Sequence, residues 1–282
     1  MASFIRMPSL LRKLAEGGIC LGKLLFFFQV CPLFAILIGN PAQPAMQKEG
    51  IVRPASWWSV RIAYFEDYVY RQRFEDEFID PELFHSKTFS RMTTDAGLIT
   101  LNFWDKLDLY GILGGSRLQL DKELFTTRQF AWGTGLKWMM YQKGNFRLGA
   151  DFKYFETDQK PTYFLSDGLP YNVVSNFTLQ YHEIQAALGI SYRAGPFIPY
   201  VYGTYLITKI RPVPASVAVR IPFAGPDGEI ESVDLLMKSI VGEKQWGVTV
   251  GATILDGEKG SLSVESRLYN QNSIDVNLEV RF

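Results

Sequence analysis

Residues 274–282, which end the chain, read Ile-Asp-Val-Asn-Leu-Glu-Val-Arg-Phe. Apolar and polar side chains alternate throughout, so one face of an extended segment carries only apolar groups. A strand that crosses a bilayer needs about 9–11 residues and an apolar face toward the lipid. This run has both. The bilayer core offers no hydrogen-bond partner to a backbone, so a sheet placed there has to close on itself.

The same alternation recurs in earlier segments of the chain. Their apolar sets are Leu148, Ala150, Phe152 and Tyr154; Ala186, Leu188, Ile190 and Tyr192; Trp246, Val248, Val250, Ala252 and Ile254; and Leu262, Val264 and Leu268. The intervening residues are mostly polar or glycine, which suits a water-filled barrel better than a globular core. A soluble sandwich with its polar face outward shows the same alternation, but the strand lengths favour the membrane. We therefore predict an all-β, transmembrane, antiparallel outer-membrane β-barrel of about 12 strands, in a range of roughly 10–16.

The first residues read as a secretory signal. Arg6, Arg12 and Lys13 precede an apolar run over 24–38, which is too short for a comfortable spanning helix. We expect cleavage after Ala35, which makes residues 1–35 a signal peptide and residues 36–282 a single barrel domain; an uncleaved signal anchor is the alternative. Cys20 and Cys31 both fall in the removed part. The mature chain would then form no disulfide and no thiolate metal site.

Composition narrows the class of function. The chain has 29 basic and 29 acidic residues, and this balance gives no reason to expect nucleic-acid binding. The histidines His85 and His182 lie far apart and lack ligand-like spacing. No motif singles out a nucleophilic serine, so we expect no metal site, no cofactor and no enzymatic activity. The six tryptophans, which fall mostly near the ends of expected strands, suggest interfacial girdles, with packing under loops as the alternative.

Four blocks of sequence carry a family resemblance. They are the run from Leu98 to Gly114 (LITLNFWDKLDLYGILG), the run from Arg61 to Arg71 (RIAYFEDYVYR), the C-terminal part from Leu235 to Phe282, and Gly39-Asn-Pro-Ala-Gln-Pro44. In this order they resemble the chlamydial major outer membrane protein family over almost the whole mature length. The resemblance implies a trimeric outer-membrane porin that passes small hydrophilic solutes and serves as an envelope component and surface antigen. This chain is shorter and lacks mature cysteines, which puts a disulfide-cross-linked envelope role in doubt.

We therefore expect a general-diffusion porin in the bacterial outer membrane; the alternative is a non-conducting structural barrel or adhesin. Glycines on the inner faces (Gly133, Gly135, Gly149, Gly189, Gly247 and Gly251) are expected to leave room for water. The charged residues expected to line the pore are Arg61, Lys137, Arg147, Asp151, Lys153, Arg193, Glu265, Arg267, Asp275, Glu279 and Arg281. Basic residues outnumber acidic ones in this set, which predicts a weak anion preference.

The final residue, Phe282, lies on the apolar face of the last strand. A terminal aromatic residue on an alternating strand resembles the signal that the barrel-assembly machinery reads, and we assign Phe282 that role. The simpler alternative is that Phe282 is only a closing residue that faces lipid. The expected partners are outer-membrane lipid, the assembly machinery, small hydrophilic solutes and two further copies of the chain.

Overall fold

The computed structural model describes residues 39–45, 57–76, 88–121, 124–166, 169–173, 176–214, 216–220, 232–236, 239–256 and 259–282. Residues 34–282 form one compact unit. The expected signal peptide over 1–35, including its cysteines, lies outside the described residues. Among those that are described, no helix is long and apolar enough to cross a membrane.

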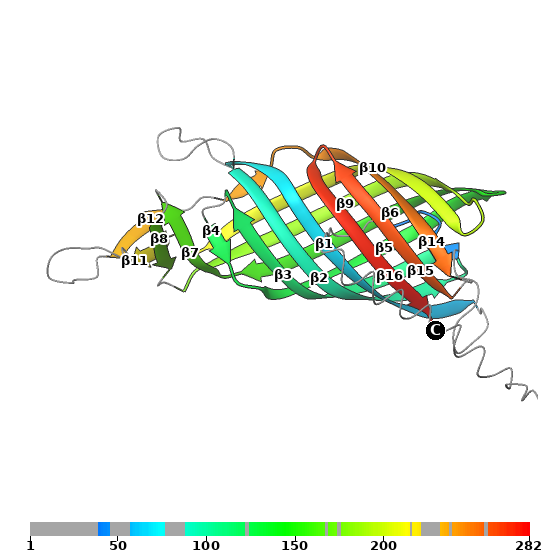
Figure 1. The fold of residues 1–282 in the computed structure, drawn as a ribbon, viewed down its shortest axis with the longest axis horizontal. Helices are drawn as coiled ribbons and strands as arrows, with labels where there is room; N and C mark the ends of the chain where they lie inside the picture. Colours follow the sequence, from blue (N-terminus) through cyan, green and yellow to red (C-terminus); the bar gives the residue numbers. More distant parts are fainter. Residues whose placement is uncertain are drawn as a thin grey trace, which may run out of the picture. The chain divides into compact units, whose positions relative to one another are not determined.

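Ten strands close into an antiparallel barrel (Figure 1). Each pairs with its neighbours along the chain, and the last pairs with the first. They are β1 (Trp58–Asp76), β2 (Thr88–Phe103), β3 (Leu107–Leu120), β5 (Gln129–Lys143), β6 (Phe146–Gln159), β9 (Thr178–Tyr192), β10 (Phe197–Val213), β14 (Trp246–Asp256), β15 (Gly260–Leu268) and β16 (Gln271–Arg281). The prediction of an antiparallel barrel is confirmed, with the strand number at the lower end of the expected range.

The strand number is lower than 12 because part of the strand-forming sequence lies outside the barrel wall. The short strands are β4 (Leu124–Thr126), β7 (Pro161–Ser166), β8 (Leu169–Val173), β11 (Ser216–Arg220), β12 (Ser232–Leu236) and β13 (Ile240–Gly242). β4, β7, β8, β11 and β12 follow one another in a chain of pairings that leaves the wall at β3, while β13 pairs with β1 and β10. These short strands therefore belong to the connections between wall strands.

The two ends of the barrel differ in their connections. Tight turns at 104–106, 144–145 and 193–196 lie at one end, which we call the short-turn end. Phe282 lies there as well, because its backbone N–H donates to the carbonyl of Val60 at 2.9 Å, near the start of β1. The long connections that contain the additional strands lie at the other end, the long-loop end. Outer-membrane barrels place short turns in the periplasm and long loops outside the cell.

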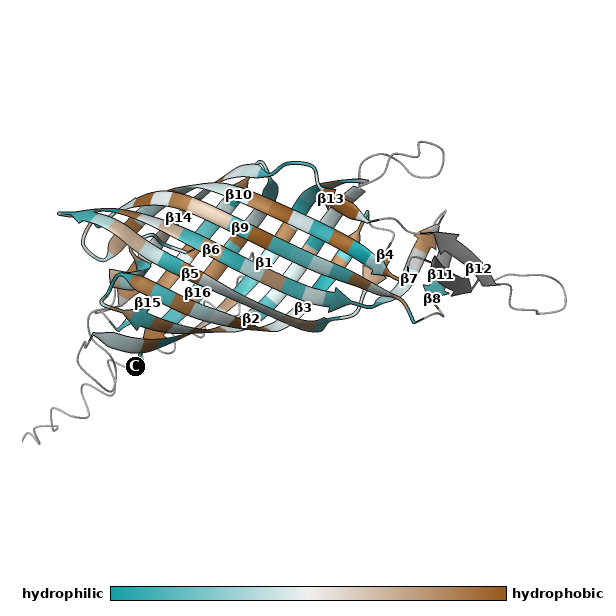
Figure 2. Cartoon of the chain, turned by 180° about the vertical axis from the view of Figure 1, so that it is seen from behind, coloured by the Kyte–Doolittle hydropathy of each residue, from teal (hydrophilic) through white to brown (hydrophobic). Residues whose placement is uncertain are grey.

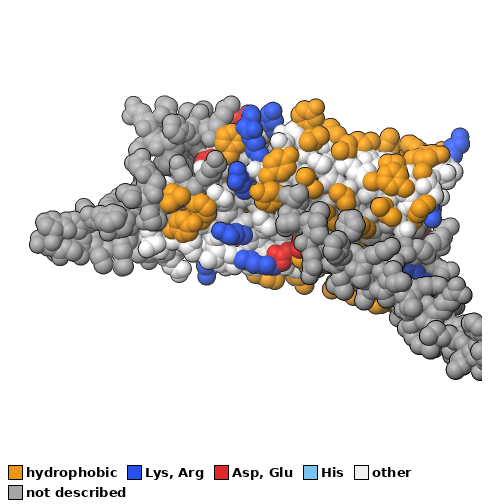
Figure 3. Space-filling view, in the orientation of Figure 1, with side chains coloured by type: hydrophobic (Ala, Val, Ile, Leu, Met, Phe, Trp, Pro, Cys, Tyr) orange, Lys and Arg blue, Asp and Glu red, His pale blue; other side chains and the backbone are white. Residues whose placement is uncertain are grey.

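The outer face carries a broad apolar belt. Hydrophobic and hydrophilic residues alternate along the wall strands in Figure 2, and the outward members include Ile62, Ile99 and Leu188, each about half exposed. Outward charges such as Glu66 and Asp95 lie nearer the long-loop end, where Arg128 forms an ion pair with Asp95. Figure 3 shows the same division on one face, with Lys and Arg side chains gathered beside an area of hydrophobic ones. The wall thus presents an apolar surface of the kind that faces lipid.

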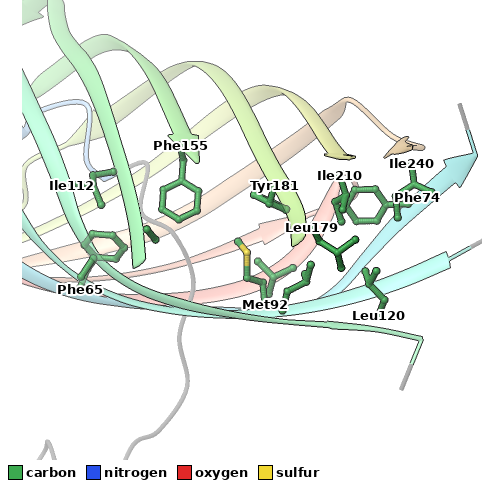
Figure 4. Close-up of a cluster of buried hydrophobic side chains, with 14 of the residues drawn as sticks. Phe65, Phe74, Met92, Ile112, Leu120, Phe155, Leu179, Tyr181, Ile210 and Ile240 are labelled. Atoms are coloured by element: carbon green, nitrogen blue, oxygen red, sulfur yellow. The ribbon is translucent and has the colours of Figure 1, made fainter. Parts of the chain in front are cut away.

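The interior toward the long-loop end contains a large apolar cluster, where the sequence predicted a polar lining. Buried hydrophobic side chains from β1, β2, β3, β6, β9 and β10 form one cluster, and Figure 4 shows several of them converging from different strands. Its members include Phe65, Met92, Phe155, Leu179 and Ile210. A barrel of this strand number is narrow, so inward side chains from opposite walls meet and exclude water. The expectation of an inner face that is polar throughout is therefore wrong for this part of the barrel.

Candidate functional site

The alternation of β16 orients the charged residues of the last strand. Residues at odd positions from Gln271 to Arg281 are buried, and the intervening residues are partly exposed. Asp275, Glu279 and Arg281 therefore point into the barrel, while Val276 and Leu278 point outward, as the sequence predicts. Because side chains in a strand alternate between its two faces, one correct register orients the whole strand.

The structure brings most of the expected pore-lining residues together. Arg61, Lys137, Arg147, Asp151, Lys153, Glu265, Arg267, Asp275, Glu279 and Arg281 are all buried on the inner face. Arg193 differs because it follows the end of β9 and is only partly buried. Its Nε donates to the carbonyl of Gly195 at 3.4 Å, in the turn at the short-turn end. Arg193 therefore belongs to the mouth of the barrel and not to its wall.

Three acidic residues on the inner face escaped the sequence analysis. Asp67 of β1, Asp108 of β3 and Glu183 of β9 are all buried. Their neighbours on the inner face, such as Phe65 and Tyr181, are aromatic, so the local pattern does not read as polar-inside. The described interior holds six buried basic and seven buried acidic side chains. The expected positive lumen, and with it the basis for anion preference, is therefore wrong.

The interior charges are paired between wall strands that lie next to each other or one strand apart. Nζ of Lys153 on β6 lies 2.8 Å from Oε1 of Glu183 on β9. Arg61 on β1 forms ion pairs with Asp108 and with Glu279, the latter at 3.3 Å. Buried ions are tolerated only where partners offset the lost hydration, and each pair joins side chains from two different strands. The charge network therefore ties the wall strands to one another.

Other interior groups need water. The side-chain amides of Gln185, Gln271 and Asn277 are buried, and no group in the described part of the chain hydrogen-bonds to them. A buried amide without a partner costs roughly 1–3 kcal/mol. Water satisfies such groups wherever space and further polar partners allow it. The polar parts of the interior are therefore suited to hydration, whereas the apolar cluster is not.

Tyrosine rings pack against several inner-face glycines and fill the space that was expected to contain water. Gly135, Gly189 and Gly251 each pair directly with an inward tyrosine on the neighbouring strand: Tyr110, Tyr202 and Tyr200 respectively. In each case a Cβ added to the glycine would overlap the tyrosine ring. Packing a ring over a cross-strand glycine fixes the register of a curved sheet. The expectation of water beside these glycines is therefore wrong.

Two of these tyrosines also join the charge network. The hydroxyl of Tyr110 donates to Asp151 at 2.8 Å, and that of Tyr200 donates to Glu265 at 3.0 Å. Both carboxylates were identified from the sequence as inward residues, but their tyrosine partners were not. The signal lay in the cross-strand register, which the sequence alone does not provide.

A short N-terminal segment, Gly39–Ala45, also lies inside the barrel. It ends in the 3-10 helix η1 (Gln43–Ala45). Asn40, Ala42 and Gln43 are almost completely buried. The sequence analysis used this segment only as part of the family resemblance, and nothing in its composition pointed to the interior.

The remaining candidates are a metal site at the histidines and girdles formed by the tryptophans. No group of three or more His, Cys, Asp or Glu among the described residues could hold a metal ion. His182 lies on β9 near Glu156, 3.9 Å from Nδ1 to Oε2, and the other histidine, His85, lies outside the described residues. All six tryptophans are exposed, Trp246 most of all at 73%. This arrangement fits girdles better than packing under loops.

Comparisons with known proteins find porins among the proteins that are similar in sequence. No protein-family model matches the chain. The chain is 23% identical to the major outer membrane porin, serovar F, of Chlamydia trachomatis, across 89% of this chain and 95% of that protein. It is 22% identical to the major outer membrane porin of Chlamydia abortus, with the same coverage.

Solved structures with some similarity include the β domain of the Bordetella autotransporter BrkA (TM-score 0.42, 11% identity, 80% of this chain and 99% of that chain). The translocator domain of the autotransporter NalP from Neisseria meningitidis has a TM-score of 0.42 and 13% identity, with 79% of this chain and 88% of that chain covered.

Proposed function

We propose that this chain, a relative of the chlamydial major outer membrane porins, is an outer-membrane porin for passive diffusion of small hydrophilic solutes and ions. One observation carries the proposal. The strands β14, β15 and β16 pair with one another in a closed barrel, and their inner faces carry hydrophilic side chains. The apolar belt on the outer face supports placement in the outer membrane. The similarity to proteins named porins extends over 89% of the chain.

Buried charge is the feature that favours passage over mere structure. A barrel built only for stability gains little from ion pairs, because apolar side chains of similar volume often stabilise an interior equally well or better. Arg267 lies 3.9 Å from both Asp67 and Asp275, longer than a direct charge-assisted hydrogen bond. Such loosely paired charges, together with amides that need water, provide a route along which a hydrated ion can exchange partners.

A non-conducting structural barrel is the second candidate, and the apolar cluster favours it. Phe155 and Tyr181 pack edge to face, with ring centroids 6.3 Å apart, inside the barrel toward the long-loop end, where a water column would have to pass. A hydrophobic constriction can exclude water and prevent conduction. The two candidates therefore make opposite predictions about current through the folded protein.

Reconstitution into a planar bilayer separates the two candidates. Refolded protein that shows the heat-dependent gel mobility of a folded barrel should produce stepwise conductance if it is a porin. Matched preparations of heat-unfolded protein provide the control for leakage by detergent or aggregates. Well-folded protein that produces no steps would reject the porin and leave the structural barrel.

Several finer features rest on the same family relation. We propose signal-peptide cleavage near Ala35, recognition of Phe282 by the barrel-assembly machinery, and assembly as a homotrimer. The relatives, which are named as porins, point to a channel without enzymatic activity. Mass spectrometry of the purified envelope protein tests the cleavage site, and cross-linking in native membranes tests the trimer.

A further inference from the structure

The N-terminal segment Gly39–Ala45, which we call the plug, is held by side chains of the barrel wall. The amide nitrogen of Gln43 donates to Glu279 at 2.6 Å, and Lys137 donates to the amide oxygen of the same residue. Arg61 donates to the carbonyl oxygen of Gln43 at 2.6 Å. One glutamine is thus bound by three charged side chains, which come from β16, β5 and β1.

A second group of contacts holds the other half of the plug. The side-chain amide of Asn40 donates to the carbonyl of Ile198 on β10 at 3.2 Å and to the hydroxyl of Thr253 on β14 at 3.1 Å. The backbone N–H of Gly39 donates to Glu265 on β15 at 2.9 Å. These strands lie on the side of the wall away from β5 in the closed order of pairing.

The distribution of partners shows that the plug crosses the lumen. Asn102 on β2 donates to the carbonyl of Pro44 at 3.1 Å, which adds a further strand to those already bound. A chain segment that hydrogen-bonds to strands on all sides of a closed barrel occupies its cross-section. The plug lies toward the short-turn end, where β1 begins, and Figure 1 shows it in dark blue at the end of the barrel that carries the C-terminus. Any solute that leaves at this end has to pass it.

The plug is a built feature and not a strand end that happens to lie in the barrel. The side chain of Ala42 packs with Ile198 and Leu255 in a small buried apolar cluster. Gly149 on β6 provides close approach as well, because an added Cβ would lie 2.9 Å from the carbonyl oxygen of Pro41. Charged partners, apolar contacts and a permissive glycine all match this one segment.

We propose that the plug is the constriction that determines which solutes pass, with Gln43 as its main specificity-determining residue. The proposal rests on the porin function proposed above. Gln43 places a neutral amide between Lys137 and Glu279, whose other ionic partners are Asp151 at 3.8 Å and Arg61 at 3.3 Å. Its removal widens the lumen at this level and exposes both charges to passing ions.

The test compares single-channel conductance of the full chain with that of the Asn40→Ala/Gln43→Ala variant. A matched control, Gln142→Ala/Asn145→Ala, removes the same two side-chain types from exposed positions of the β5–β6 hairpin at the same end of the barrel. We expect the plug variant to rise about twofold or more in unit conductance, because conduction depends on the narrowest section of a pore. The control should match the wild type. Swelling of liposomes in neutral sugars should show a higher size limit for the plug variant alone.

The outcomes separate this proposal from the porin proposal. Equal conductance of the wild type and a correctly folded plug variant would overturn the plug as constriction and leave the porin intact. Absence of conductance in the wild type and in every variant would overturn both the plug as constriction and the porin proposal. Conductance in the plug variant alone would overturn passive diffusion through the native barrel and, with it, the plug as a selector among solutes. If the double variant does not insert, Gln43→Ala alone provides the same comparison, since it removes the two side-chain contacts to Lys137 and Glu279 and keeps those of Asn40.

Discussion

Replacing Gly135 with alanine should destabilise the barrel, because the new methyl group has no space. Its Cβ would overlap the ring of Tyr110 and lie 2.6 Å from the carbonyl oxygen of Phe152. The backbone oxygen cannot rotate away, so the strands or the ring must shift. Overpacking of this kind costs about 1–3 kcal/mol. Displacement of the ring would also break the hydrogen bond from Tyr110 to Asp151, adding roughly 1.5–3 kcal/mol for a charged acceptor.

The expected loss in free energy of unfolding is therefore roughly 2.5–6 kcal/mol. Gly111 provides a matched control, since it lies on β3 next to Tyr110 and an added Cβ there would meet nothing within 4 Å. Gly111→Ala should change the stability by less than about 0.5 kcal/mol. Urea unfolding in lipid vesicles, followed by tryptophan fluorescence, measures both. The reasoning is refuted if the two alanine variants unfold at the same urea concentration.

Three further results are expected. Lys153→Met should destabilise the barrel by about 3–5 kcal/mol, because it removes the ion-pair partner of the buried Glu183; the added change Glu183→Gln should recover part of that loss in the same unfolding assay. Deletion of Phe282 should lower the amount of protein in the outer membrane far more than Arg281→Gln does, and normal levels after the deletion would contradict its role in assembly. The reversal potential across a salt gradient should lie near zero, because acidic and basic charges in the interior nearly balance; a strong preference for anions would show that the inward acids do not act on the passing ions.

The sequence predicted the orientation of most inner residues because that orientation follows from a local rule. In β16, Asp275, Glu279 and Arg281 alternate with apolar neighbours, and the structure places all three inside. Where the inner face mixes polar and apolar residues, the rule loses its signal. Asp67 follows an inner-face position occupied by Phe65, and it was missed for that reason.

The hydration of the interior could not be read from the sequence. Glycines at Gly135 and Gly251 suggest open space when each strand is read alone. Their cross-strand partners are Tyr110 and Tyr200, and only the register of β3 with β5 and of β10 with β14 shows that rings occupy that space. The number of wall strands has the same dependence, because pairing decides which strands enter the wall and which extend beyond it.

The sequence itself thus determined three features: the alternation of the membrane strands, the apolar outer belt and the charged inner face. Successive side chains of a strand point to opposite faces, so their direction depends only on whether a residue's position is odd or even. The tertiary structure alone decided what fills the interior. Gln43 meets Glu279, Lys137 and Arg61 across long separations in sequence, and the apolar cluster forms where opposite walls approach. Such contacts depend on barrel closure, strand number and register, which are properties of the whole sheet and of no single segment.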